Sequence, residues 1–97
     1  MEFTIPAHHP ALAGHFPGHP VVPAVVILDQ VAALLAEFRP GARLVRVVSA
    51  KFIAPLAPEQ RCRVEFTPRS GGQIRFTCSV GGRTVASGLL ETGDAAP

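Results

Sequence analysis

The stretch that decides the fold is AVVILDQVAALLAEF, residues 24–38. Pro23 stands just before it, where a proline suits the first turn of a helix, and the sequence RPG at 39–41 follows it, where a helix stops. The sequence therefore predicts a helix over residues 24–38. A helix that is apolar almost all round must be buried almost all round, so the remaining chain has to cover it.

The few polar side chains of this helix divide it into two unequal faces. Gln30 and Glu37 share a stripe with Leu34, and we expect this stripe to be the edge toward water. Asp29 lies about 100° from that stripe, toward the apolar side. The helix thus carries one carboxylate that its own pattern directs toward the apolar side.

The chain around the helix has the period of β-strands. Residues 61–67 and 74–80 alternate apolar and polar side chains, and glycine pairs that suit hairpin turns follow them. In residues 43–53 the apolar phase slips by one position after Val47, which predicts a bulge or a strand covered on both faces. Two further strands are expected at residues 2–6 and 83–90.

One amphipathic sheet covers such a helix only if it curls around it. The predicted fold is therefore α+β, with a curled antiparallel sheet wrapped around a central buried helix, in a single domain over residues 1–97. We expect residues 92–97 to be a frayed tail. Because five short strands leave apolar surface uncovered, we expect a homodimer or a higher homo-oligomer.

Composition excludes several classes of function. Hydrophobic residues make up 47% of the chain, the net charge is +2, and the absence of Trp and Tyr leaves little to stack on nucleic-acid bases. Residues 21–36 are too short and too interrupted to cross a bilayer, and the N-terminus does not resemble a signal peptide. Cys62 and Cys78 match no metal or redox spacing, so we expect buried thiols in a reducing compartment, the cytoplasm.

A constellation of catalytic type surrounds the helix start. His15 lies in a loop rich in Gly and Pro, fourteen positions before Asp29. An imidazole and a buried carboxylic acid form a base and an acid, and free N–H groups at residues 23–25 suit an oxygen that gains charge. Each residue also has a simpler interpretation, because a lone loop histidine is often structural and Asp29 could face water at the helix edge. A metal site combining His15 with the nearby histidines lacks a fitting spacing, so no metal is expected.

The stretch GHFPGHPVVPAVVILDQVA, residues 14–32, resembles the motif of the 3-hydroxyacyl acyl-carrier-protein dehydratases, the hot-dog fold enzymes of fatty acid synthesis. The later stretches SAKFIAPLAPEQ (49–60) and IRFTCSVGGRTVASGLL (74–90) resemble the family's next strand and its last hairpin. An Asp at the acid position is similar to the dehydratase-isomerase branch and to small dehydratase-like proteins of polyene and polyketide clusters.

The resemblance implies a role for each motif residue, and no cofactor. His15 takes the proton from C2 of a 3-hydroxyacyl thioester and Asp29 protonates the leaving C3 hydroxyl. The N–H of Ala24 holds the thioester oxygen, and the carbonyl of Val21 orients the imidazole. The motif residues Phe16 and Gly18 complete the substrate-positioning turn. The family draws His and acid from different subunits, and its substrates are carried by acyl-carrier protein or coenzyme A.

Three departures from the family pattern bear on the substrate. The family usually has Gly where this chain has Ala24, a common Gln is Ala33 here, and the chain starts only fourteen residues before His15. A different or shorter acyl group is therefore expected. Two alternatives stay open from the sequence, a hot-dog acyl thioesterase and an acyl-binding subunit without turnover.

Overall fold

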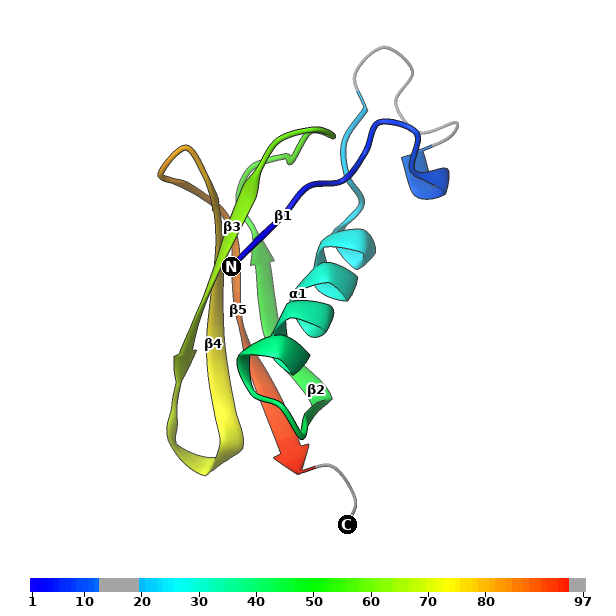
Figure 1. The fold of residues 1–97 in the computed structure, drawn as a ribbon. Helices are drawn as coiled ribbons and strands as arrows, with labels where there is room; N and C mark the ends of the chain where they lie inside the picture. The colour runs from blue at the N-terminus through cyan, green and yellow to red at the C-terminus, as the bar shows by residue number, and fades with distance from the viewer. Residues whose placement is uncertain (13–19, 95–97) are drawn as a thin grey trace.

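The computed structural model describes residues 1–12 and 20–94 of the chain and shows five antiparallel strands and one long helix (Figure 1). The elements are β1 (Glu2–Phe3), η1 (Pro10–Leu12), α1 (Ala24–Phe38), β2 (Ala42–Phe52), β3 (Cys62–Pro68), η2 (Ser70–Gly72), β4 (Gln73–Val80) and β5 (Arg83–Asp94). The α+β prediction is confirmed. In the described parts of the chain, no helix has the length and apolar character needed to cross a membrane.

Helix α1 has the predicted bounds. Pro23 precedes it in an extended conformation, with φ −61° and ψ 148°, and the N–H of Arg39 donates to the Leu35 carbonyl over 2.9 Å at its end. The chain then turns at Gly41, whose φ of 88° is one that side chains with a Cβ avoid. Proline before the first turn and glycine after the last one therefore set the length of the helix.

One face of α1 packs on the sheet and the other does not. Val26, Ile27, Val31 and Leu35 are all buried against the sheet. The opposite face is exposed along a stripe of Val25, Asp29, Ala33 and Ala36. The prediction of a helix buried nearly all round is thus wrong for a single chain, because one sheet layer covers only one side of a helix.

The predicted water edge of the helix is also misplaced. Gln30 and Leu34 are half-buried, and of that stripe only Glu37 is exposed. The stripe that faces outward is the one centred on Asp29. The sequence pattern predicted that the polar stripe lies outermost, whereas the outermost stripe in the structure is apolar apart from Asp29.

The five strands form one sheet in the order β1-β3-β4-β5-β2. Residues of β3 and β4 alternate in burial as predicted, with Val64 opposite Cys78 and Phe66 opposite Phe76. The sheet and α1 enclose one apolar core whose largest fully buried side chains are Phe76, Leu35, Leu56 and Ile74. Strand β1 pairs over only two residues, so it is shorter than the predicted strand 2–6.

Strand β2 forms the edge of the sheet and is irregular. Its pairing with β5 shifts between Leu44 and Arg46 and again between Val47 and Ser49, which confirms the predicted bulge. Nearly every residue of β2 is exposed, including the apolar Val45 and Phe52. An edge strand with exposed apolar side chains is a surface suited to a further chain.

Strand β5 is longer than predicted. It continues to Asp94, and Thr92 lies opposite Leu44 and donates its hydroxyl to the Gly72 carbonyl over 2.7 Å. The expected frayed tail is therefore wrong for residues 92–94, since their pairing with β2 orders them, while residues 95–97 lie outside the described part.

Cys62 and Cys78 are free thiols, fully buried on the inner face of β3 and β4. A hydrogen bond with Cys62, together with burial, raises the pKa of the Cys78 thiol. That thiol therefore stays neutral and packs as a small apolar side chain.

Candidate active site

The entrance to α1 is fixed to a distant part of the chain. The N–H of Val22 donates to the carbonyl of Leu56 over 2.8 Å, and both side chains are almost fully buried. This bond holds the segment before the helix beside the segment that follows β2. The space between the two segments is open, and it forms a pocket.

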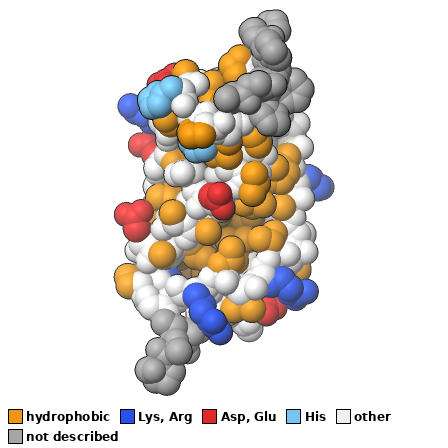
Figure 2. All heavy atoms as spheres, turned by 90° about the vertical axis from the view of Figure 1, so that its right-hand side faces the viewer, with side chains coloured by type: hydrophobic (Ala, Val, Ile, Leu, Met, Phe, Trp, Pro, Cys, Tyr) orange, Lys and Arg blue, Asp and Glu red, His pale blue; other side chains and the backbone are white. Residues whose placement is uncertain are grey.

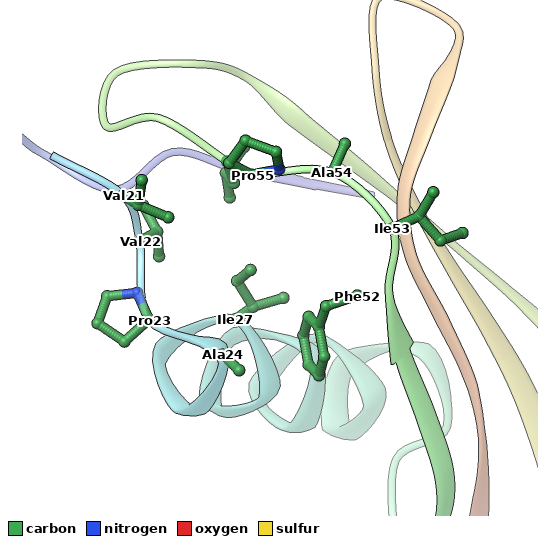
Figure 3. A pocket seen from close by; sticks show the side chains of 10 residues that line it. Val21, Val22, Pro23, Ala24, Ile27, Phe52, Ile53, Ala54 and Pro55 are labelled. Carbon is green, nitrogen blue, oxygen red and sulfur yellow. The ribbon is translucent and has the colours of Figure 1, made fainter. Parts of the chain in front are cut away.

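The pocket has a volume of about 360 Å³ and an apolar wall. Figure 3 shows Val21, Val22 and Pro23 on one side, Ala24 and Ile27 from the first turn of α1 below, and the segment Phe52–Pro55 opposite. None of its lining residues carries a charge. Such a wall suits the hydrocarbon part of a ligand.

Two backbone N–H groups at the N-terminus of α1 are free to donate hydrogen bonds. The hydrogen bonds to the Pro23 carbonyl come from the N–H groups of Val26 (3.0 Å) and Ile27 (3.3 Å). The N–H groups of Ala24 and Val25 precede this hydrogen-bonded turn, so the helix itself provides no acceptor for them. Ala24 also lines the pocket, which places a donor and the positive end of the helix dipole beside the apolar cavity.

The predicted positioning residues Val21 and Ala24 are thus brought together at one pocket. The sequence did not point to the opposite wall, formed by Phe52, Ile53, Ala54, Pro55 and Leu56. The stretch 49–60 has an apolar run between two polar ends, which is a signal for a buried or lining segment. Because this stretch lies far along the chain from Ala24, the sequence did not show that the two meet.

Asp29 lies on α1 one turn beyond Val25, and its side chain is exposed in the single chain. The expected burial of this carboxyl is therefore wrong for one chain alone. The exposed residues of its stripe, one and two turns away, are apolar. A second molecule placed against this face would give Asp29 the apolar surroundings that its expected role requires.

The predicted base and turn residues, His15, Phe16 and Gly18, lie outside the described residues. Of the nearby histidines, His9 has a structural role, since its Nδ1 accepts the N–H of Ala11 over 3.1 Å at the start of η1. Within residues 1–12 and 20–94, no three His, Cys, Asp or Glu side chains gather as a metal site would require.

Comparison with known proteins assigns the chain to a family. The model of the ApeI-like family, described as ApeI dehydratase, matches residues 1–89. The chain belongs to the ApeI-like dehydratases. This membership agrees with the resemblance of residues 14–32, and the hot-dog fold that the resemblance implied is confirmed.

Curated relatives of this chain carry the name 3-hydroxyacyl acyl-carrier-protein dehydratase FabZ. The protein of Geotalea uraniireducens (strain Rf4) is 33% identical over 99 residues, which cover 92% of this chain and 67% of the relative. That of Anaeromyxobacter sp. (strain Fw109-5) is 35% identical over 99 residues, which cover 86% and 63%. The chain thus spans about two thirds of the length of these relatives.

Solved structures share the fold of this chain. An uncharacterized protein of Erwinia carotovora subsp. atroseptica has a TM-score of 0.80 at 24% identity, covering 96% of this chain and 80% of the other. The dehydratase heterocomplex ApeI:P of Xenorhabdus doucetiae gives 0.79 at 20%, with 94% and 82% covered. A variant of the fluoroacetyl-CoA-specific thioesterase FlK gives 0.66 at 19%, with 96% and 84% covered.

Proposed function

We propose that this chain dehydrates a 3-hydroxyacyl thioester to the trans-2-enoyl thioester, in fatty acid, polyene or polyketide synthesis. The observation that carries the proposal is the apolar pocket that opens at Ala24, where a helix N-terminus offers a free N–H beside a cavity fit for an acyl chain. Family membership supports the reaction class, and the two buried free thiols suit the cytoplasm.

In the proposed reaction His15 removes the proton from C2. The electron pair of that C–H bond forms the C2–C3 double bond while the C3–O bond breaks, and Asp29 gives the leaving hydroxyl its proton, so that water departs. During proton removal the thioester oxygen gains negative charge, and the Ala24 N–H stabilises it. The Val21 carbonyl holds the imidazole, while Phe16 and Gly18 shape the turn.

The proposed active protein is a homodimer or a larger assembly of this chain. Exposed apolar side chains gather on the face of α1 and β2, among them Val25, Val45 and Val47. Figure 2 shows this face as a broad apolar area with most charged side chains near its margin. A second copy seated there would cover both this area and Asp29, which supports a site built from two chains.

The test compares loss of water with loss of thiol. We expect purified protein, given 3-hydroxyacyl thioesters of several lengths on acyl-carrier protein and on coenzyme A, to form the conjugated enoyl thioester without releasing thiol. His15→Ala and Asp29→Asn should each lower the rate at least about a hundredfold, the usual contribution of a positioned acid or base. Neither substitution should change the thermal midpoint by much.

The alternative reaction is hydrolysis of the thioester, because the thioesterase FlK has a similar fold. In a thioesterase the acid would activate water, and the assay would detect free thiol and a carboxylic acid in place of the enoyl product. Binding of the thioester with neither product would indicate an acyl-binding subunit without turnover, and either outcome would refute the proposed dehydration.

A further inference from the structure

Glu59 has a strained backbone. Its φ is 68°, and among the described residues it is the one non-glycine residue with a positive φ. Glycine would adopt this left-handed conformation without the clash that a Cβ brings. Strain of this kind persists where the surrounding structure enforces it, and it is a reason to ask what the side chain does there.

Glu59 makes two hydrogen bonds to the segment before η1. Its Oε1 accepts the N–H of Ala7 over 2.7 Å, and its own N–H donates to the carbonyl of Ile5 over 2.8 Å. A bond of this length from an amide to a carboxylate is charge-assisted, and it is stronger than one between neutral groups. The Ile5 side chain is buried in the core, so the hydrogen bond to the Ile5 carbonyl holds Glu59 in place. The carboxylate of Glu59 then holds Ala7, two residues after Ile5.

The segment that contains Glu59 also binds Val22, which follows His15 in the sequence. Three residues before Glu59, the Leu56 carbonyl accepts the N–H of Val22. The short segment from Leu56 to Glu59 therefore anchors Ala7 at one end and Val22 at the other end of the stretch that contains His15 in the sequence. Leu56 is itself part of the wall of the pocket at Ala24, and Figure 3 shows the Val21–Pro23 segment across the pocket from Ala54 and Pro55.

We propose that Glu59 is a positioning residue for the reaction. Its carboxylate fixes Ala7, and through Ala7 the described residues that precede His15 in the sequence, to the segment that includes Leu56 of the pocket wall. The inference rests on the proposed dehydration. An error of about 1 Å in the position of a catalytic group is enough to reduce turnover strongly, so an anchor on the residues that lead to His15 in the sequence affects kcat more than substrate binding.

Three substitutions of Glu59 separate the effect of its side-chain hydrogen bond from the effect of its backbone strain. Glu59→Ala removes the acceptor and keeps the strain, so we expect kcat to fall about tenfold while KM changes less than about twofold. Glu59→Gln retains an oxygen that can accept the Ala7 N–H, and should recover most of the wild-type kcat. Glu59→Gly removes the acceptor and also the strain, so it should melt no lower than Glu59→Ala while its kcat stays low.

A merely structural role predicts the opposite pattern. In that case kcat per folded molecule would follow the thermal midpoint, and Glu59→Gly would recover activity together with stability. That result, or an unchanged kcat in Glu59→Ala, overturns the proposal. If Glu59→Ala does not fold, the comparison of the Gln and Gly variants still decides, because only the former keeps the acceptor.

Gln60 supplies a matched control in the same turn. Its Oε1 accepts the N–H of Ala57 over 2.9 Å, a bond that stays within the turn and does not reach the segment that contains Ala7. Gln60→Ala should leave kcat within about twofold of wild type. Wild-type protein that forms no enoyl product overturns the dehydration and this inference together, whereas active wild type with an unaffected Glu59→Ala variant overturns the positioning role alone.

Discussion

Ala24 stands where the helix dipole, the pocket and the proposed thioester oxygen meet. A proline at this position would remove the N–H and little else, because Pro23 already has the extended φ and ψ that the residue before a proline adopts. Proline is also accepted in the first helical turn. We expect Ala24→Pro to lower kcat for dehydration about a hundredfold, the typical loss for one oxyanion donor, with a thermal midpoint close to wild type.

Ala24→Gly is the matched control, since it keeps the N–H and removes only the methyl group. It should retain activity, and a changed preference among acyl chain lengths would show that the methyl group touches the substrate. Dehydration kinetics of both variants on one thioester series make the comparison. Full activity in Ala24→Pro would rule out the Ala24 N–H as the oxyanion donor.

The resemblance to the family motif pointed to part of the pocket lining. Val21 and Ala24 were assigned from the motif, and both line the pocket. Phe52 and Leu56 could not be assigned in that way, because their place beside the helix depends on how the chain after β2 turns back toward Val22. The surroundings of Asp29 also lay beyond the sequence, since burial of an outward-facing carboxyl depends on a second molecule.

Among the strands, β5 contains a position where only glycine fits. Gly88 lies between Phe76 of β4 and Ala50 of β2 in the ladder. A methyl group there would meet the carbonyl oxygen of Ser49 and lie 2.6 Å from the Phe76 ring. Because Phe76 is fully buried, the ring has no room to withdraw. Gly88→Ala should therefore destabilise the fold by about 1–3 kcal/mol, the usual cost of overpacking.

Chemical denaturation of Gly88→Ala and wild type measures this cost. Ser87→Ala is the control, because Ser87 neighbours Gly88 on the same strand, is half-buried, and becomes smaller rather than larger. The control should differ from wild type by less than about 1 kcal/mol. Equal stability of Gly88→Ala and Ser87→Ala would mean that Phe76 and β2 can shift to make room.

At the level of elements, the sequence predicted the helix and the two hairpins that pair β3 with β4 and β4 with β5, but it did not predict the full extent of β5. Pro23 and the sequence RPG at 39–41 bounded α1. The slip of apolar phase after Val47 predicted the shift between Val47 and Ser49, whereas the shift between Leu44 and Arg46 was not predicted. The extension of β5 to Asp94 was missed because the letters ETGD carry no strand pattern of their own. That segment is a strand because β2 lies beside it, which is a property of the sheet rather than of the segment.

The whole molecule exposes large apolar side chains on α1 and β2, and a continuous exposed apolar surface marks a site of interaction. Val25 is 63% exposed and Val45 is 51% exposed, and they come from α1 and from the edge strand β2. We expect light scattering at micromolar concentration to give at least twice the mass of one chain. Val45→Glu should lower that mass toward the monomer, because it buries a charge without a partner in the proposed interface.

Thr67→Glu introduces the same charge at an exposed position of β3, which β4 and β5 separate from β2 in the sheet. It should leave the measured mass unchanged. A monomeric wild type would refute both the dimer and a site shared between chains. If Val45→Glu kept the full mass, the partner would have to sit on a face other than β2.

The final prediction concerns whether the His15 and the Asp29 of one pocket come from the same chain or from two chains. Asp29 faces outward on α1, so the chain that supplies His15 to a given pocket need not be the chain that supplies the acid. His15→Ala and Asp29→Asn, each inactive alone, are to be unfolded, mixed in equal amounts and refolded. Random pairing makes roughly half of the dimers mixed.

A mixed dimer with shared pockets has one pocket with both substitutions and one with neither. The intact pocket takes His15 from the Asp29→Asn chain and Asp29 from the His15→Ala chain. About a quarter of all pockets then work, so activity should return to roughly a quarter of wild type. If each chain supplies its own pair, every pocket lacks one group and mixing restores nothing. Mass spectrometry that detects mixed dimers without recovered activity would therefore exclude a site shared between chains, and each chain would then supply both His15 and Asp29 to its own pocket.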